Sequence, residues 1–252
     1  MKKILALIVI FFISTSICFA AGQKKKSSVV RMEIETKDGF VLVGDFYPSK
    51  VRDKKMPLVF MLHSVNGKSA DWGDLPKKIA KEGNNVFALD MRGHGRSVYN
   101  VNFRYVSRSY LKPKMWLKFP NDTVETINFL KEHYSMVDYD HIIFVGADLG
   151  ANTAILAGKT LKPEPDKMVL ISPTQKFKGL HTPLVLSDYE KTKFMLIAAE
   201  TDKYFLLQAK TLDKFIQTQS TLKIYPKGGS GTLLLKQSKD VADDIIKFIY
   251  EN

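Results

Sequence analysis

The sequence predicts an α/β protein in which helices cover both faces of a mostly parallel sheet. Short, continuous apolar runs recur along the chain, as is typical of strands that are buried on both faces. Segments of helical length separate these runs. The 252 residues are 45% hydrophobic and 25% charged, which is ordinary for one globular domain with a sizeable core. Strands that alternate with helices after an opening hairpin are the pattern of such an α/β sandwich.

The individual elements follow in order from the same patterns. The domain opens with a strand at residues 29–35, a tight turn at 37–39 and a partner strand at 40–47. Further strands are expected at residues 57–63, 85–90, 141–145, 167–172, 193–199 and 222–225. Helices are expected at residues 71–81, 123–133, 149–161, 204–217 and 241–250. Function gathers at the carboxyl ends of the strands in such sheets, so the loops there are the first candidates for a site.

The first 20 residues have the pattern of a secretory signal peptide. Lys2 and Lys3 form a basic start, and residues 4–19 are apolar apart from a short Ser-Thr-Ser interruption. Cys18 and Ala20 occupy the small-residue positions before a cleavage site. We therefore expect cleavage after Ala20 and export to the periplasm or out of the cell. An uncleaved membrane anchor and a lipoprotein modified at Cys18 are the alternatives.

The chain divides into a signal peptide at residues 1–20, a basic segment at 21–27 and a single α/β domain at 28–252. Cys18 is the only cysteine, so a chain cleaved after Ala20 has no disulfide, thiol nucleophile or cysteine metal site. The formal net charge of +12 favours anionic partners such as membrane lipids or cell-wall polymers. A solvated, lysine-rich surface is the alternative. No nucleic-acid motif is present, and the sequence does not predict an oligomeric state.

Residues 146–150 form a pattern of small residues around an aspartate at the end of a strand. Gly146 and Gly150 stand two positions before and after Asp148, between a buried strand and an alanine-rich helix. A strained turn from strand to helix needs small residues at these positions, and it presents the central side chain at the sheet edge. The pattern is weak by itself, but its place in the chain makes Asp148 a candidate site residue.

Motifs after the first two buried strands carry a resemblance to a known family. Residues 62–63 are Leu-His, 71–72 are Asp-Trp, and 90–97 read Asp-Met-Arg-Gly-His-Gly-Arg-Ser. Together with the turn at Asp148, they make the chain resemble the α/β-hydrolase superfamily over roughly residues 40–250. It looks most like the lidless bacterial serine esterases and peptidase-like hydrolases. The resemblance implies an α/β-hydrolase fold. We expect no cap domain, because the segment between the predicted strands at residues 167–172 and 193–199 is too short to form one.

The resemblance also implies roles for individual residues. Asp148 stands at the nucleophile position, which is usually serine in this superfamily. Asp202 matches the acid, and Ser230 stands in a Gly-Gly-Ser-Gly-Thr turn where the catalytic histidine is expected. The backbone N–H groups of Val65 and Leu149 match the oxyanion hole. Two of the three catalytic positions therefore depart from the usual triad.

Three further residues lie in loops beside this site, namely His63, Ser64 and His94. We expect the two histidines to hold loop geometry by hydrogen bonds. No histidine follows His181, so no imidazole is expected to activate a hydroxyl, and the usual acyl-enzyme route is closed. The main prediction is a catalytically degenerate member of the fold. It would bind a small-molecule or peptide ligand, or a partner, at the mouth of the former active site.

Other functions of the same residues stay open. Asp148 could act as a nucleophile, as aspartate does in the haloalkane dehalogenases and epoxide hydrolases of this fold, which makes a hydrolase of ester or related bonds the main alternative. Asp148 could instead only cap the following helix. Asp148, Asp202 and Ser230 would suit calcium or magnesium if they converged. We nevertheless predict no metal and no cofactor. His181 could reach Asp148 only if its loop folded inward.

The segment at residues 96–119 mixes aromatic residues with lysines and arginines and connects a strand to a helix beside the site. Aromatic rings among cations could bind sugars, peptides or anionic polymers. The alternative is a long loop that packs on the domain through its own aromatic rings. This segment is one reason to keep a basic surface-associated protein as the third functional hypothesis.

Overall fold

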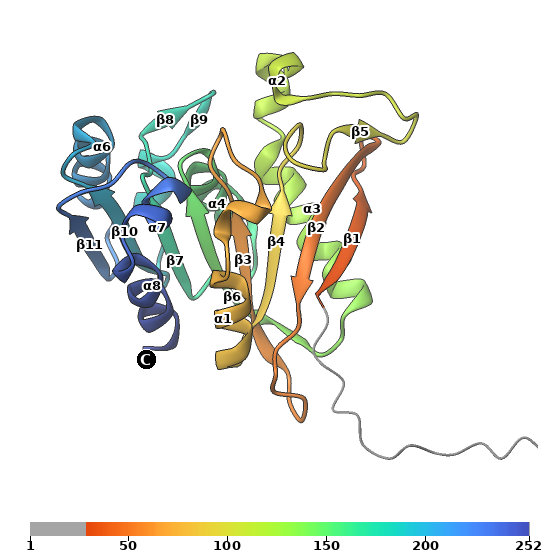
Figure 1. Ribbon diagram of the computed structural model, residues 1–252, viewed down its shortest axis with the longest axis horizontal. Coiled ribbons are helices and arrows are strands. Elements are labelled where there is room, and N and C mark those ends of the chain that lie inside the picture. The colour runs from red at the N-terminus through yellow and green to blue at the C-terminus, as the bar shows by residue number, and fades with distance from the viewer. Residues whose placement is uncertain (1–28, 252) are drawn as a thin grey trace, which may run out of the picture.

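The computed structural model describes residues 29–251, which are built around one large β-sheet (Figure 1). The predicted signal peptide, the basic segment at 21–27 and Cys18 lie outside the described residues. The order of the main strands is β1-β2-β4-β3-β6-β7-β10-β11, with β5 on β2, and β8 pairs with β9 separately. The strands are β1 Val30–Glu35, β2 Phe40–Tyr47, β3 Met56–Leu62, β4 Asn85–Asp90, β5 Tyr99–Asn100, β6 Val137–Ala147, β7 Lys167–Ile171, β8 Lys176–Phe177, β9 Leu180–His181, β10 Lys193–Ala199 and β11 Ser220–Tyr225.

The sheet is mostly parallel. β2 is antiparallel to β1, β4 and β5, whereas the pairs from β4 through β3, β6, β7, β10 and β11 are all parallel. The inner parallel strands are buried on both faces, which explains their continuous apolar runs. Their carboxyl ends lie at the edge that carries β5 and α2 (Pro113–Trp116) in Figure 1.

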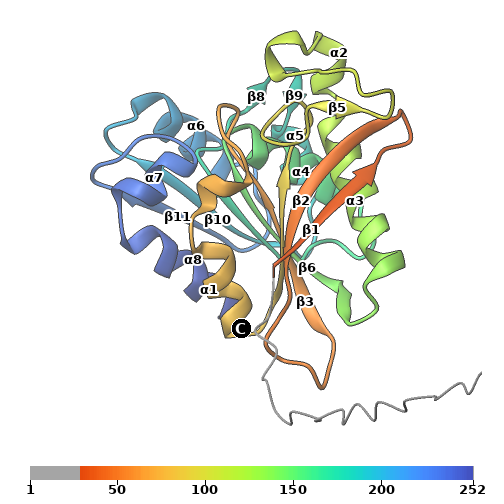
Figure 2. The ribbon, with the colours of Figure 1, turned by 45° about the vertical axis from the view of Figure 1, so that its right-hand side comes forward.

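Helices cover both faces of the sheet and create two apolar cores. α3 (Phe119–His133), α4 (Leu149–Thr160), α5 (Pro183–Ser187) and α6 (Lys203–Asp213) contribute to one core. α1 (Leu75–Glu82), α7 (Thr232–Gln237) and α8 (Asp240–Tyr250) contribute to the other. Figure 2 shows α1 and α8 on one side of the sheet and α3 on the other. This arrangement confirms the predicted α/β fold with helices on both faces.

Most predicted elements are present, and three strands have the predicted bounds, namely β2, β4 and β10. The predicted helix at 71–81 is instead a 3₁₀ helix, η1 (Ser69–Trp72), followed by α1, because Gly73 adopts a positive φ of 58° between them. Short elements that the sequence pattern did not predict include β5, the 3₁₀ helix η2 (Arg108–Tyr110), α2 and α7. Only β8, β9 and α5 lie between β7 and β10. In the described part of the chain, no helix combines the length and the apolar character that crossing a membrane requires.

Candidate active site

The turn between β6 and α4 has the strained geometry that the sequence predicts. Asp148 has φ 53° and ψ −115°, a conformation that an L residue rarely adopts. The neighbouring glycines permit it: a Cβ on Gly150 would lie 2.0 Å from the carbonyl oxygen of Leu62, and one on Gly146 would lie 2.5 Å from that of Gly150. The backbone N–H of Asp148 donates to Ile171 across the sheet edge at 2.8 Å. The small residues are therefore required by packing.

The Asp148 side chain turns inward and is only 6% exposed. Its Oδ2 accepts a hydrogen bond from the backbone N–H of Val65 at 3.1 Å, and the N–H of Leu149 also stabilises the carboxylate. Oδ1 is buried without a hydrogen-bond partner among the described residues. Burial raises the pKa of Asp148 to about 6, and the two N–H groups offset only part of that effect.

Val65 and Leu149 are the two residues whose N–H groups the family resemblance assigns to the oxyanion hole. In the structure the N–H of Val65 donates to the carboxylate of Asp148, so a carboxylate oxygen of the protein itself occupies one of the donors that the resemblance assigns to the oxyanion hole. The N–H of Leu149 lowers the pKa of the same carboxyl. The alternative of a conventional helix cap is not supported, because the Asp148 side chain accepts no capping hydrogen bond of the usual kind from α4. Its main backbone contact comes from a different loop.

The turn that contains Ser230 packs against the elbow. The N–H of Gly231 donates to Oγ of Ser172 at 2.9 Å, and the N–H of Thr232 donates to Oγ of Ser64 at 2.9 Å. A Cβ on Gly231 would lie 3.4 Å from the Cβ of Asp148. Backbone from this turn therefore lies directly against the Asp148 side chain. Ser64, predicted only as site-adjacent, and Ser172, which the sequence analysis missed, hold the turn in place.

Asp202 is the N-cap of α6, and its carboxylate accepts a 3.4 Å hydrogen bond from the N–H of Phe205. Its loop is joined to the Ser230 turn through Thr201, whose Oγ1 donates to the Gly228 carbonyl and accepts from the Gly228 N–H, at 2.7 and 3.0 Å. The loops thus meet at one edge of the sheet. Nevertheless, no hydrogen bond links Asp148, Asp202 and Ser230, and residues 29–251 contain no cluster of three or more metal-ligating side chains.

The two histidines of the signature segments are structural, as predicted. His63 is fully buried, its Nδ1 lies 2.7 Å from the Ser64 carbonyl, and its Nε2 accepts from the N–H of Met91. Burial lowers the pKa of His63 to about 4, so the ring is neutral. His94 places its two ring nitrogens 2.8 Å from the carbonyl oxygens of Arg92 and Val65. Neither ring forms a hydrogen bond with Asp148, and His181 is exposed on β9.

The carbonyl of Val65, in the peptide group that follows the N–H bound to Asp148, is held by two side chains. Besides His94, Arg108 donates from Nη1 to this carbonyl at 3.0 Å and to Oδ1 of Asn66 at 2.7 Å. A cavity of about 580 Å³ opens beside this loop, and we call it the mouth cavity. Its lining includes Asn66, Lys68, His94, Tyr105, Ser107 and Arg108. The mouth cavity lies next to the Val65 peptide, but Asp148 itself is not part of its wall.

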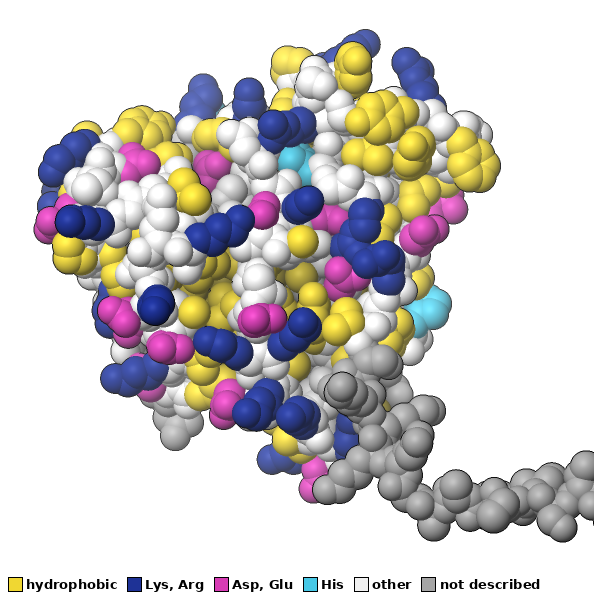
Figure 3. Space-filling view, in the orientation of Figure 1, with side chains coloured by type: hydrophobic (Ala, Val, Ile, Leu, Met, Phe, Trp, Pro, Cys, Tyr) yellow, Lys and Arg dark blue, Asp and Glu magenta, His cyan; other side chains and the backbone are white. Residues whose placement is uncertain are grey.

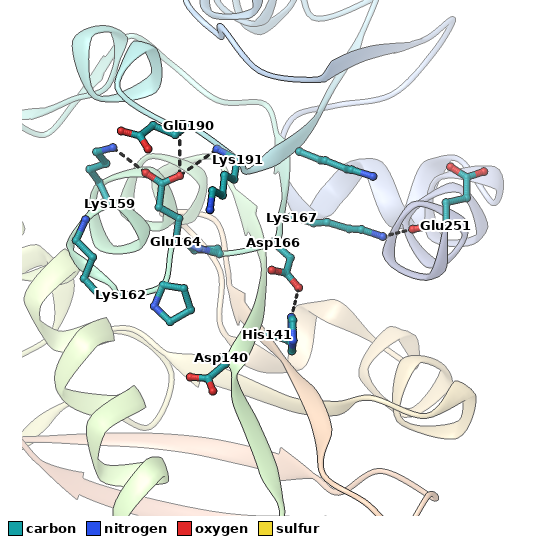
Figure 4. Close-up of a pocket in the computed structure, with 13 residues that line it drawn as sticks. Asp140, His141, Lys159, Lys162, Glu164, Asp166, Lys167, Glu190, Lys191 and Glu251 are labelled. Atoms are coloured by element: carbon teal, nitrogen blue, oxygen red, sulfur yellow. Dashed lines mark hydrogen bonds and ion pairs between the residues drawn. The ribbon is translucent and has the colours of Figure 1, made fainter.

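A larger cavity of about 730 Å³ lies at the other end of the sheet, close to the first residues of β7 and β10 (Figure 4). Two pairs of its charged side chains bind each other: His141 pairs with Asp166 at 2.8 Å, and Lys159 pairs with Glu164 at 2.8 Å. Lys167 donates to backbone carbonyls at the end of α8. We assign these contacts to stability, because sites in such sheets form at the opposite edge.

The sheet order and the strained turn at Asp148 define an α/β-hydrolase-fold protein. Sequence comparison narrows this class: a family model described as serine aminopeptidase, S33 matches residues 53–187, which is more than half of the chain. The chain belongs to this family. No curated protein matches it in sequence.

Solved structures agree on the fold at low sequence identity. A predicted CIB-like hydrolase from Thermoplasma acidophilum is 18% identical with a TM-score of 0.65, covering 88% of this chain and 98% of its own. DcsB, solved in complex with its substrate analogue, is 16% identical with a TM-score of 0.70, covering 89% and 99%. A carboxyl esterase from Bacillus coagulans is 11% identical with a TM-score of 0.69, covering 89% and 98%. These likenesses support the architecture and leave function to the site itself.

Proposed function

We propose that this protein no longer hydrolyses esters or amides by the serine route and instead binds a small ligand at the mouth of the former active site. The observation that carries the proposal is the Asp148 carboxylate bound by the N–H of Val65. A substrate carbonyl would have to displace this carboxylate to reach the donor. Even then it would meet neither a hydroxyl nucleophile at position 148 nor an imidazole.

The packing of the Gly231 backbone against Asp148 supports the same proposal. The hydrogen bonds from the turn to Ser64 and Ser172 would have to break before a substrate could reach the elbow. The mouth cavity, in contrast, is lined by Asn66 and Arg108, which lie beside the Val65 carbonyl, and Asp148 is not part of its wall. A ligand there would occupy the outer part of a hydrolase site without contacting reactive groups.

The lining of the mouth cavity favours a ligand with a carboxylate group. Arg108 and Lys68 supply positive charge, and Asn66 and Ser107 supply hydrogen-bonding groups. The acid in the wall, Asp71, is paired with Lys236 at 3.2 Å. An organic carboxylate or the C-terminus of a short peptide would therefore find more cation than anion in this cavity.

Ligand binding is tested by thermal unfolding with benzoate and with N-acetylated dipeptides as probes. We expect at least one probe to raise the Tm of the wild type, since saturation at about 100 times Kd stabilises a protein by roughly 2.7 kcal/mol. Arg108→Ala should abolish the shift, and Arg31→Ala, on the distant β1, should keep it. No shift with any probe, or an equal shift in Arg108→Ala, would refute binding in the mouth cavity.

Hydrolysis that uses Asp148 as the nucleophile is the second candidate. The φ of 53° at Asp148 favours it, because strained backbone often persists where it positions a reactive group. Attack by the Asp148 carboxylate on an alkyl carbon would form an ester with the enzyme and release the leaving group, whereas attack on an ester carbonyl would form a mixed anhydride and release the alcohol. No histidine forms a hydrogen bond with Asp148 to activate water for the second step. This candidate therefore predicts a trapped covalent adduct, visible by mass spectrometry after incubation with an activated substrate.

We also propose that the chain is exported and cleaved after Ala20. The supporting observations are the two lysines, the apolar run and the small residues of the first 20 positions. The test is the intact mass of the protein recovered from its natural host. A mass that begins at Ala21 supports the proposal, and a retained N-terminus or a lipid on Cys18 contradicts it.

A further inference from the structure

The segment from β5 to α2 exposes four large aromatic side chains at the carboxyl edge of the sheet. Tyr99, Phe103, Tyr105 and Tyr110 are 48%, 88%, 55% and 69% exposed. We call these four residues the aromatic rim. Figure 3 shows hydrophobic side chains next to lysines and arginines at the upper right, over β5 and the segment that leads to α2. The alternative prediction for this segment, in which its own rings pack on the domain, therefore fails for these four.

Phe103 is held outward by a well-bonded turn. Oδ1 of Asn100 accepts from the N–H groups of Asn102 and Arg104 at 3.1 and 2.9 Å, and the N–H of Phe103 donates to the Asn100 carbonyl at 2.9 Å. Phe103 itself has a positive φ of 57°. Both the backbone strain and the exposed phenyl ring cost free energy in water, which favours a function for the exposed ring.

The turn is also anchored to the sheet. β5 pairs with β2 through Asn100 and Phe40, and the rings of Tyr99 and Tyr105 meet edge to face with centroids 5.7 Å apart. The aromatic rim is therefore a preformed surface at the end of a strand pair, and binding would not require it to fold first.

Positive charge surrounds the aromatic rim. Residues 91–121 contain no acidic residue, and their lysines and arginines are Arg92, Arg96, Arg104, Arg108, Lys112, Lys114 and Lys118. Arg104, Lys112 and Lys114 are exposed and form none of the ion pairs found within residues 29–251. Arg104 and Lys112 also line a cavity of about 630 Å³ below the rim, together with Tyr105 and Tyr110.

We propose that the aromatic rim docks on the surface of an anionic phospholipid membrane. Phe103 would insert at the boundary between headgroups and acyl chains, and the tyrosines would lie at headgroup level with their hydroxyls in water. Arg104, Lys112 and Lys114 would contact lipid phosphates, and the cavity below the rim would accept one headgroup. The acid in the wall of this cavity, Asp38, is paired with Arg92 and Lys118. Exposed aromatic rings among unpaired cations therefore match this occupant better than a folded protein surface.

Insertion of the rim is tested in the full chain by tryptophan fluorescence with Phe103→Trp. The two natural tryptophans, Trp72 and Trp116, are 2% and 8% exposed, so a new tryptophan at 103 reports the rim. Vesicles of phosphatidylcholine with phosphatidylglycerol should shift its emission to the blue, and pure phosphatidylcholine should not. The control is Leu207→Trp on α6, where the wild-type side chain is 63% exposed. No shift at 103, or an equal shift at 207, would overturn the proposal.

Vesicle co-sedimentation tests the individual groups. Phe103→Ser, and separately the double change Arg104→Ala with Lys112→Ala, should each weaken binding to the anionic vesicles roughly tenfold. Lys54→Ala with Lys55→Ala, exposed in the loop between β2 and β3, is the matched charge control and should change binding less than twofold. Binding that Phe103→Ser leaves unchanged would indicate attraction to any polyanion and would contradict docking through the rim.

Discussion

At the scale of single residues, Asp148 combines burial, backbone strain and an unpaired oxygen. Its exposed fraction is 6%, and its carboxyl has a pKa of about 6 because burial disfavours the charged form. Between pH 4 and 6 the folded state therefore holds a proton that the unfolded state has lost. The contribution of Asp148 to the free energy of unfolding therefore falls as pH rises through this window. This destabilisation is complete above pH 6.

Asp148→Asn should consequently stabilise the protein at neutral pH. Removing the buried charge should raise the free energy of unfolding by up to about 2–3 kcal/mol above pH 6, and the gain should vanish below pH 4. Urea unfolding from pH 3.5 to 8 measures the difference in the free energy of unfolding between wild type and variant. Groups that titrate equally in both proteins do not contribute to this difference. A gain that does not depend on pH would mean that the carboxyl titrates normally.

Arg92 is the residue-scale feature that the sequence could not reveal. It is 2% exposed, contacts both oxygens of Asp122 at 2.5 and 2.8 Å and both of Asp38 at 2.8 and 2.9 Å, and stacks on Phe40. Its place in the signature at 90–97 was visible, but its partners lie 54 and 30 positions away. Such pairings depend on the fold.

Arg92→Met should destabilise the protein by about 3–5 kcal/mol, because it leaves the buried Asp122 without its partner. Arg31→Met, which removes a pairing of an exposed side chain with Asp45, should cost at most about 1 kcal/mol. Urea unfolding compares the two. If adding Asp122→Asn to Arg92→Met recovers none of the loss, the unpaired carboxylate is not its cause.

At the scale of elements, the elbow between β6 and α4 depends on close approach of backbone. Gly150→Ala should abolish folding or cost at least about 4 kcal/mol, since its Cβ would lie 2.0 Å from the Leu62 carbonyl oxygen. Gly73→Ala introduces strain at φ 58° but meets no atom within 4 Å, so it should cost only about 1–3 kcal/mol. Urea unfolding of the protein that remains soluble compares the two variants. Equal losses of unfolding free energy would argue against the close contact between position 150 and the Leu62 carbonyl.

Elements were predictable where one pattern dominates. β2 and β4 were found with their predicted bounds, because hydrophobic runs and turn residues mark them clearly. α7 was missed because its apolar residues, including the buried Leu234, form too short a run for a helical period. The glycine-rich turn before it was located correctly, but its packing onto Ser64 and Ser172 depends on loops far away in the sequence.

At the scale of the whole molecule, the fold brings the carboxyl ends of β3, β6, β10 and β11 together, as the family resemblance implied. The resemblance correctly gave the superfamily and the elbow. It could not give the inward turn of the Asp148 side chain, because the sequence specifies a residue type but not which N–H it meets. The proposed loss of hydrolysis therefore depends on the hydrogen bond between the Asp148 carboxylate and the N–H of Val65.

The most direct measurement is p-nitrophenol release from p-nitrophenyl acetate and butyrate by wild type and Asp148→Asn, from pH 5 to 9, with protein in excess of substrate. Protein in excess reveals a single turnover, and a second series with substrate in excess reveals a burst or a steady rate. We predict that both proteins match an unfolded-protein blank and that neither shows a burst. A burst or steady turnover in the wild type that disappears in Asp148→Asn would identify Asp148 as a working nucleophile and would contradict the account.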